Sequence, residues 1–248
     1  MHRYLTVLMA LALIFTASCR KKITYDGFDE NKLFSLYELY EQKAYRDLDE
    51  AMNEPDQVYK LVLYMQDLKE VPEEVYHFKY LNTLELTRNQ LDEIPEYIGD
   101  MIYLQSLYIS DNLFTAVPPQ AFRLPNLKRL KIEGNQIEAI PMELIRKENV
   151  DEIYMGRNKL TEIPMELYDM EQLRVLKLDE NQIGSLPPEV SRLKNLEVLD
   201  LEKNKLESFP WTILELENLR VIKLGRNQIP MHELDSLRKA MPDVKVDY

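Results

Sequence analysis

The feature that most constrains this chain is an internal repeat of 23 residues. The pattern L-x-x-L-x-L-x-x-N-x-L-x-x-I-P begins eight times in one phase, without an insertion. Within each repeat the apolar fourth and sixth positions alternate with outward-facing ones, which is the period of a β-strand with one buried face. No repeat can bury that face alone, so the repeats must stack. They begin at Val58, Leu81, Leu104, Leu127, Val150, Leu173, Leu196 and Leu219.

The spacing between strands determines how they stack. Each return of the chain uses well over a dozen residues, which suits a crossover to a parallel strand, and such crossovers are almost always right-handed. Strands stack about 4.8 Å apart, whereas the returning segments are bulkier, so the sheet should line the inner side. The sequence therefore predicts an α/β fold. It is a right-handed solenoid with parallel strands on the concave face and short helical or 3-10 segments on the convex face.

Seven of the 13 prolines share one phase of the repeat. Proline fixes φ near −65° and has no N–H to donate, which suits the start of a short helical segment. These prolines therefore mark the convex segments. They are Pro72, Pro95, Pro118, Pro141, Pro164, Pro187 and Pro210.

The ninth position of the repeat is asparagine in seven of the eight repeats. Backbone groups that are buried where a strand turns away need hydrogen-bond partners. An asparagine amide both donates and accepts, so it can connect its own turn to the neighbouring one. We expect a structural ladder formed by Asn89, Asn112, Asn135, Asn158, Asn181, Asn204 and Asn227.

The run I-P-x-E-L-x-x-L, together with the full pattern, resembles leucine-rich repeats of the 23-residue class. Such repeats occur in bacterial surface proteins and in eukaryotic Ras-associated scaffolds. The resemblance implies a module that binds another protein through its concave surface.

Both ends of the repeat array have sequences suited to capping. Apolar residues at helical spacing from Leu33 to Ala44, and a second helix start at Asp47 that ends at Pro55, predict a helical N-terminal cap. Leu234 and Leu237 predict a last amphipathic helix, followed by an edge strand. The expected single solenoid domain has a cap over 32–57, eight repeats over 58–230, and a closing helix and strand over 231–248.

The N-terminus has the form of an export signal. A short basic start precedes a continuous apolar run that ends in small residues before Cys19, the only cysteine of the chain. This placement resembles the lipobox of bacterial lipoproteins, although Thr16 departs from the usual leucine. The resemblance implies a signal peptide over 1–18, a lipid on Cys19 and a tether over 19–31. Because Arg20 rather than aspartate follows the cysteine, it implies the outer membrane where the cell has one. An ordinary signal peptide cut before Cys19 is the alternative.

Composition and motifs argue against other chemistries. The formal net charge of −12 disfavours a protein that tracks nucleic-acid phosphates. No glycine-rich phosphate loop, nucleophile elbow or zinc spacing occurs, and His77 and His232 fall near opposite ends of the array. We therefore predict no catalytic residues, no metal and no cofactor, and hence no enzyme.

The remaining candidate is the surface of the sheet. The repeat register places polar and aromatic side chains on the concave side, where tyrosines are suited to anchoring an interface. We predict a monomeric protein that contacts a protein partner through Tyr64, Glu85, Tyr108, Lys131, Tyr154, Arg157 and Lys177. The alternative interpretation is that these tyrosines are simply solvent-exposed strand residues with no role in binding.

The residues that follow the phase-locked prolines form a partly apolar lateral stripe, which is a second candidate binding surface. We call it the lateral stripe; it consists of Pro119, Met142, Met165, Pro188 and Trp211, the only tryptophan. Two other functions also remain open. One is a structural or glycan-binding component of the cell envelope, and the other is an intracellular signalling scaffold of the Ras-associated type. Acylation at Cys19 would exclude the scaffold.

Overall fold

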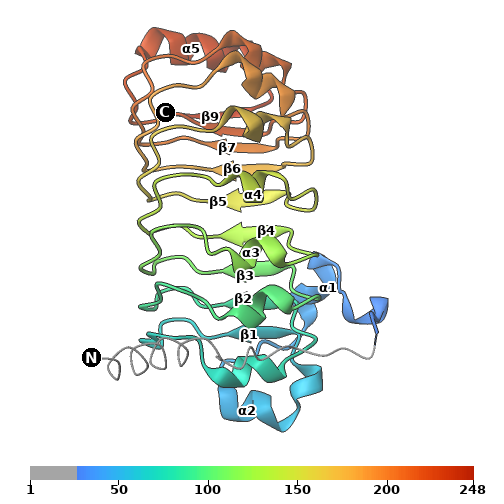
Figure 1. The fold of residues 1–248 in the computed structure, drawn as a ribbon. Helices are drawn as coiled ribbons and strands as arrows, with labels where there is room; N and C mark the ends of the chain where they lie inside the picture. Colours follow the sequence, from blue (N-terminus) through green and yellow to red (C-terminus); the bar gives the residue numbers. More distant parts are fainter. Residues whose placement is uncertain (1–26) are drawn as a thin grey trace, which may run out of the picture.

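The computed structural model describes residues 27–248. One sheet of nine parallel strands runs through the molecule, and the strands follow one another in chain order (Figure 1). This confirms the predicted solenoid of parallel strands. The strands are β1 Lys60–Val62, β2 Thr83–Glu85, β3 Ser106–Tyr108, β4 Arg129–Lys131, β5 Glu152–Tyr154, β6 Val175–Lys177, β7 Val198–Asp200, β8 Val221–Lys223 and β9 Lys245–Asp247.

The pairing register follows the repeat. Leu84 pairs with Leu107, and Leu107 pairs with Leu130, so residues of equal phase lie side by side from β1 to β8. The last step is one residue longer, because Val221 pairs with Lys245. Side chains of equal phase therefore form straight rows across the sheet.

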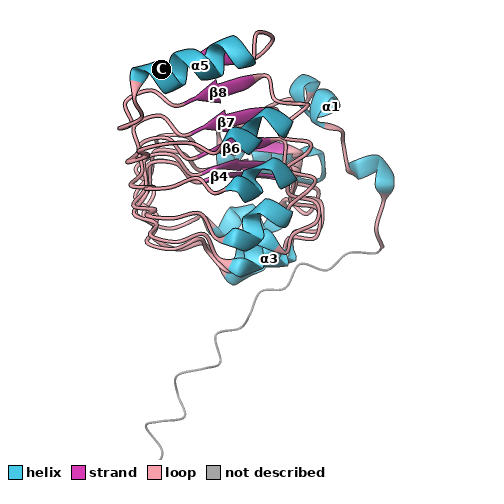
Figure 2. Ribbon diagram, turned by 90° about the horizontal axis from the view of Figure 1, so that it is seen from above, coloured by secondary structure: helices cyan, strands magenta, loops and turns pink. Residues whose placement is uncertain are grey.

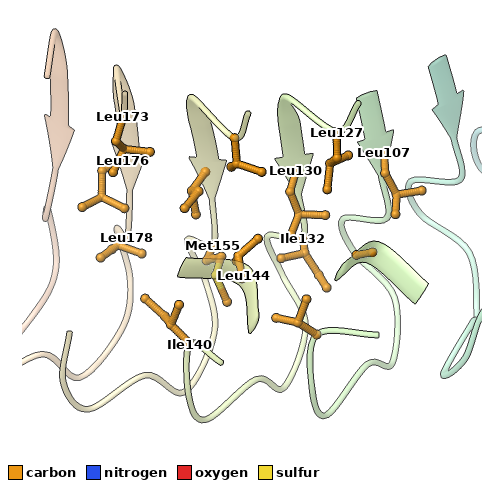
Figure 3. Packing of buried hydrophobic residues seen from close by; sticks show 14 of the residues in the cluster. Leu107, Leu127, Leu130, Ile132, Ile140, Leu144, Met155, Leu173, Leu176 and Leu178 are labelled. Atoms are coloured by element: carbon orange, nitrogen blue, oxygen red, sulfur yellow. The ribbon is translucent and has the colours of Figure 1, made fainter. Parts of the chain in front are cut away.

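The core lies between the sheet and the returning segments. Leu130 of β4 and Ile132, which directly follows β4, project toward Ile140 and Leu144 on the opposite side (Figure 3). Leu130, Ile132 and Leu144 are completely buried. One continuous apolar cluster runs from Tyr45 to Met241, so each repeat is stabilised mainly by its neighbours.

Short helical segments cover the side of the core opposite the sheet. Six of them begin directly after a phase-locked proline, and the third follows Pro119 rather than Pro118. No donor is lost at these starts, because proline has no N–H. The segments are η3 Glu73–His77, η4 Glu96–Asp100, α3 Gln120–Arg123, α4 Met142–Ile145, η5 Met165–Asp169, η6 Pro188–Arg192 and η7 Trp211–Glu215.

The asparagine side chains connect neighbouring turns by hydrogen bonds. The Nδ2 group of Asn158 donates to the carbonyls of Ile132, Met155 and Gly156 at 3.0, 3.1 and 3.1 Å, and its Oδ1 accepts from the Ile137 amide at 3.0 Å. Ile132 and Ile137 belong to the preceding repeat, so one side chain joins two turns. Equivalent bonds are made by Asn89, Asn112, Asn135, Asn181, Asn204 and Asn227.

The residue before the ninth position of each of the eight repeats adopts a left-handed backbone, a feature that the sequence analysis did not predict. The φ values lie between 52° and 63°, and only one of the residues is glycine. This conformation costs non-glycine residues about 1 kcal/mol or more, so the ladder bonds must hold the turn in place. The residues are Met65, Arg88, Asp111, Gly134, Arg157, Glu180, Lys203 and Arg226.

The N-terminal part of the described chain lies along the side of the repeats. The Asp29 amide donates to the Tyr103 hydroxyl at 2.7 Å, and Asn82 accepts from the Phe34 amide at 3.1 Å while donating to the Lys32 carbonyl at 2.8 Å. We call residues 28–34, which include η1 Glu30–Lys32, the strap. The strap begins within the predicted 19–31 tether, and Asp29 of that segment is bound to the third repeat through Tyr103.

Two short helices follow the strap where one longer apolar helix and a second helix were expected. Helix α1, Leu36–Glu41, begins with a capping box of Ser35 and Glu38, and lies beside the ends of the strands (Figure 2). The first helix is short because Tyr45 joins the sheet edge. Its amide donates to the Lys60 carbonyl, and its carbonyl accepts from the Val62 amide at 2.8 Å. Helix α2, Leu48–Asn53, and η2 Pro55–Gln57 complete this end.

The other end is closed by α5, Met231–Ala240, and by β9 (Figure 1). Leu234 and Leu237 of α5 are buried against the last repeat. Among the described helices, none is long and apolar enough to cross a lipid bilayer. Cys19 and the predicted export signal lie outside the described residues.

Candidate functional site

The first and third residues of each strand point away from the core and form a surface that we call the sheet face. Among the predicted site residues, the register brings Glu85, Tyr108, Lys131, Tyr154 and Lys177 side by side in one row across β2 to β6. Tyr64 follows β1 and lies apart from this row, with the Arg88 guanidinium 5.6 Å from its ring centroid. Arg157 lies in the turn after β5. That these residues bind a partner remains a prediction.

Tyrosine and lysine alternate along this row. The Lys131 Nζ lies 4.8 Å from the ring centroid of Tyr108 and 4.7 Å from that of Tyr154. The Lys177 Nζ lies 5.1 Å from the Tyr154 ring on its other side. Ammonium groups within about 6 Å of an aromatic ring attract it electrostatically. The tyrosine rings are thus held in place by lysines rather than standing free.

An ion pair in the neighbouring row holds the same tyrosines. Arg129 binds both carboxylate oxygens of Glu152, one of them from Nη2 at 2.6 Å, and its Nη1 donates to the Tyr108 hydroxyl at 3.1 Å. The Tyr154 hydroxyl donates to Glu152 at 2.9 Å. The Glu152 carboxylate therefore orients the Arg129 guanidinium and the Tyr154 phenol, and the guanidinium in turn orients the Tyr108 phenol. We call Tyr108, Arg129, Lys131, Glu152 and Tyr154 the tyrosine cluster.

Burial and charge shift the titration of this cluster. Burial disfavours the Glu152 carboxylate, but the hydrogen bonds and charge of Arg129 outweigh it, so the pKa of Glu152 lies below its ordinary value. Burial and the Glu152 charge raise the pKa of Tyr154 far above the neutral range. The carboxylate is therefore ionised and the phenol protonated at neutral pH, as their hydrogen bond requires.

Arg157 reaches across a whole repeat. Its Nη1 donates to the Asp111 carboxylate at 2.5 Å, although the two residues belong to turns that are two repeats apart. Gly134 lies between them, and a Cβ there would come within 2.1 Å of the Asp111 Oδ1. The absence of a side chain at Gly134 opens the path for this pair.

Further along the sheet face, acidic groups gather around Asp179. Burial, followed by the nearby Asp200 charge, raises the pKa of Asp179 above its ordinary value. A Cβ at Gly156 would come within 2.4 Å of the Asp179 Oδ1, so this carboxylate occupies the space left by a glycine. No group of residues in the described chain has the side chains and spacing to hold a metal ion.

The lateral stripe is partly exposed. Trp211 is 49% exposed and packs edge-on against Phe209, and Met165 is 46% exposed. These side chains lie on the helical segments η5 and η7 and not on the sheet face. The two candidate surfaces are therefore spatially separate.

The sequence analysis did not predict two residues of the tyrosine cluster as site residues. Arg129 and Glu152 share a phase in adjacent repeats and carry opposite charges, and this signal was available. Burial distinguishes this pair from the exposed ion pairs, because side-chain exposure is 23% for Arg129 and 7% for Glu152.

Comparisons with known protein families agree with the repeats seen in the structure. Residues 102–160 and 125–183 match a family model described as leucine rich repeat, and residues 156–242 match one described as leucine-rich repeat region. No curated protein sequence is similar enough to this chain to count as a relative.

Solved structures share the fold. A leucine-rich-repeat protein of Leptospira interrogans is 30% identical with a TM-score of 0.67, over 78% of this chain and 55% of its own. The plant peptide hormone receptor RGFR1, solved in complex with RGF2, is 28% identical with a TM-score of 0.59, over 69% of this chain and 29% of its own. The ectodomain of the receptor kinase GASSHO1/SCHENGEN3 of Arabidopsis thaliana, solved with CASPARIAN STRIP INTEGRITY FACTOR 2, is 30% identical with a TM-score of 0.60, over 72% and 23%.

This chain thus spans about half the length of the Leptospira protein and less than a third of either plant receptor.

Proposed function

We propose that this protein, which has the leucine-rich-repeat fold, binds a protein partner through its sheet face and does not act as an enzyme. The observation that carries the proposal is the tyrosine cluster, in which two phenols are fixed by an ion pair and a lysine on a rigid wall. Aromatic side chains that are already ordered lose little entropy when a partner covers them. The two plant receptors carry ligands in their structures, which supports a binding role for this fold.

Charge pairing within the sheet face also supports recognition of one specific partner. Lys223 pairs with Asp200 at 2.8 Å, and Arg129 pairs with Glu152, so these four charges are neutralised within the protein. A partner does not have to neutralise these ions when it excludes water. Shape and the tyrosine rings therefore contribute more to affinity than net charge.

The test uses the full chain with Cys19→Ser as bait for capture from extracts of the source cells. We expect the partner to be retained by this protein, and retention to fall at least tenfold when both Tyr108→Ala and Tyr154→Ala are introduced. Trp211→Ala, on the lateral stripe, is the matched aromatic control and should leave retention unchanged.

Two outcomes contradict this proposal. Equal retention by the tyrosine variant and its parent would show that the sheet face does not bind. Retention that survives protease treatment of the extract would show that the ligand is not a protein, as expected for the glycan-binding alternative.

We further propose that a lipid on Cys19 anchors the mature protein to a membrane of the cell envelope, the outer one where present. The support is the sequence: an apolar run, small residues and one cysteine in the order that lipoproteins use. Several acyl chains, at about 0.8 kcal/mol per buried methylene, would hold the protein firmly.

Mass spectrometry of the N-terminal peptide tests the anchor. We expect a diacylglyceryl group on Cys19, and release into the soluble fraction on Cys19→Ser. An unmodified Cys19 thiol in the membrane fraction would contradict the anchor and leave the sheet-face proposal intact.

A further inference from the structure

A groove lies at the N-terminal end of the sheet face, where α1 stands beside the strands. Leu39 and Tyr40 of α1 form one wall. The floor is formed by the first residues of β1 to β4, which are Lys60, Thr83, Ser106 and Arg129. Glu85 and Tyr108, the third residues of β2 and β3, extend this floor on one side.

The strap holds this wall in position. Gln105 donates to the Phe34 carbonyl at 2.6 Å and to the Asn82 side chain at 2.9 Å, while Leu39 is 4% exposed. These bonds join the strap, directly before α1, to the second and third repeats. The groove is thus a built feature of the N-terminal end, because α1 stands beside the first strands and the later strands have no helix at the same place (Figure 1).

Arg129 and Tyr108 bind each other in the groove, whereas three other polar side chains that line it have no partners in the described chain. The side chains of Lys60, Thr83 and Glu85 make no hydrogen bond or ion pair with any described residue. Thr83 is only 5% exposed, and its hydroxyl is open to the groove, whereas the Ser106 hydroxyl is completely enclosed. Buried polar groups normally have partners, so an unpartnered hydroxyl in a groove indicates a missing ligand.

The chemistry and size of the groove fit an extended peptide. Three strand spacings of about 4.8 Å separate Lys60 from Arg129, which is the length of about four extended residues at roughly 3.4 Å each. A hydroxyl group such as that of Thr83 both donates and accepts, as peptide N–H and C=O groups require. Lys60 and Glu85 carry opposite charges, which fits an acidic and a basic side chain near each other. Tyr40, 83% exposed, supplies an apolar wall.

We propose that this groove binds an extended segment of about four residues from a protein, with an acidic side chain at Lys60 and a basic one at Glu85. The inference rests on the proposed function and specifies the part of the partner that is recognised. The peptide runs across the strands beside α1, and the Thr83 hydroxyl bonds its backbone.

The test is selection from a library of acetylated, amidated pentapeptides on the Cys19→Ser full chain. We expect enrichment of peptides that carry one acidic and one basic residue within two positions of each other. Lys60→Glu should shift the selection from acidic to basic residues. Thr83→Val, which removes an unpartnered hydroxyl at nearly constant volume, should weaken binding of the selected peptide about tenfold without lowering the melting temperature. Lys205→Gln, on an exposed turn far from the groove, is the matched control.

The results separate this inference from the proposed function. Peptide binding that is unchanged by both Lys60→Glu and Thr83→Val would overturn the groove proposal, as would binding to a saccharide array in place of peptides. If Lys60→Glu retains the captured partner while Tyr154→Ala loses it, the groove is wrong and the sheet-face proposal stands. If neither variant loses the partner, the sheet-face proposal fails as well.

Discussion

Replacing Asn158 with alanine is expected to lower the free energy of unfolding by about 3 kcal/mol. The side chain makes four hydrogen bonds to backbone groups of its own repeat and the one before it, in a residue that is 8% exposed. Alanine removes them all and leaves buried carbonyls without partners. The neighbouring Arg157 also keeps its left-handed backbone, with φ of 53°, only while the turn is held. Chemical denaturation of both proteins measures the difference.

Asn149→Ala is the matched control for this loss. Asn149 is exposed and makes one bond, to the Pro125 carbonyl at 2.9 Å. Its removal should change stability by less than about 1 kcal/mol. Similar denaturation midpoints for the two variants would contradict a structural role for the ladder.

Replacing Glu152 with alanine is expected to cost about 2–4 kcal/mol of stability at pH 7. The change leaves the half-buried Arg129 guanidinium without its carboxylate and the Tyr154 hydroxyl without its acceptor. Removing one partner of a buried pair costs more than the pair contributes, because the remaining charge stays desolvated. The partial exposure of Arg129, 23%, is the reason for the lower end of the range.

The effect of Glu152 should depend on pH. Because its pKa is lowered in the folded state, ionisation of Glu152 stabilises the fold above the ordinary glutamate pKa of about 4.3. That contribution is lost as pH falls through the folded-state pKa, so the two proteins should converge in acid. Glu180→Ala, in an exposed pair with Lys203, should change stability by about 0.5 kcal/mol or less. Equal effects of the two substitutions at pH 7 would contradict the account of the cluster.

The repeat predicted the sheet well, because the determinants of the sheet are local and periodic. A leucine at fixed phase, such as Leu107, must face the same core as Leu84 and Leu130, and this alone sets the register. The strap could not be predicted in the same way. Its bonds join Phe34 to Asn82 and Gln105, and no periodic pattern connects residues so far apart in sequence.

The sequence analysis also did not predict the left-handed turns, because most residue types at these positions do not indicate a positive φ. Gly134 is the one glycine at this position, whereas Arg157 and Glu180 give no conformational signal. The tyrosine–lysine row followed from the repeat phase, but the Arg129–Glu152 pair needed burial to distinguish it from surface charges. The reach of Arg157 to Asp111 likewise depends on the missing side chain of Gly134 between them.

The most direct measurement of the central claim is oxidative footprinting of the full chain with Cys19→Ser, free and in complex with its captured partner. Tyrosine, tryptophan and methionine report separately, and the structure places them on different surfaces. Tyr108 and Tyr154 lie on the sheet face, and Trp211 and Met165 lie on the lateral stripe. Binding through the sheet face predicts that oxidation of the two tyrosines falls at least fivefold in the complex while Trp211 and Met165 are unchanged. Protection of Trp211 and Met165, with the tyrosines unaffected, would contradict it.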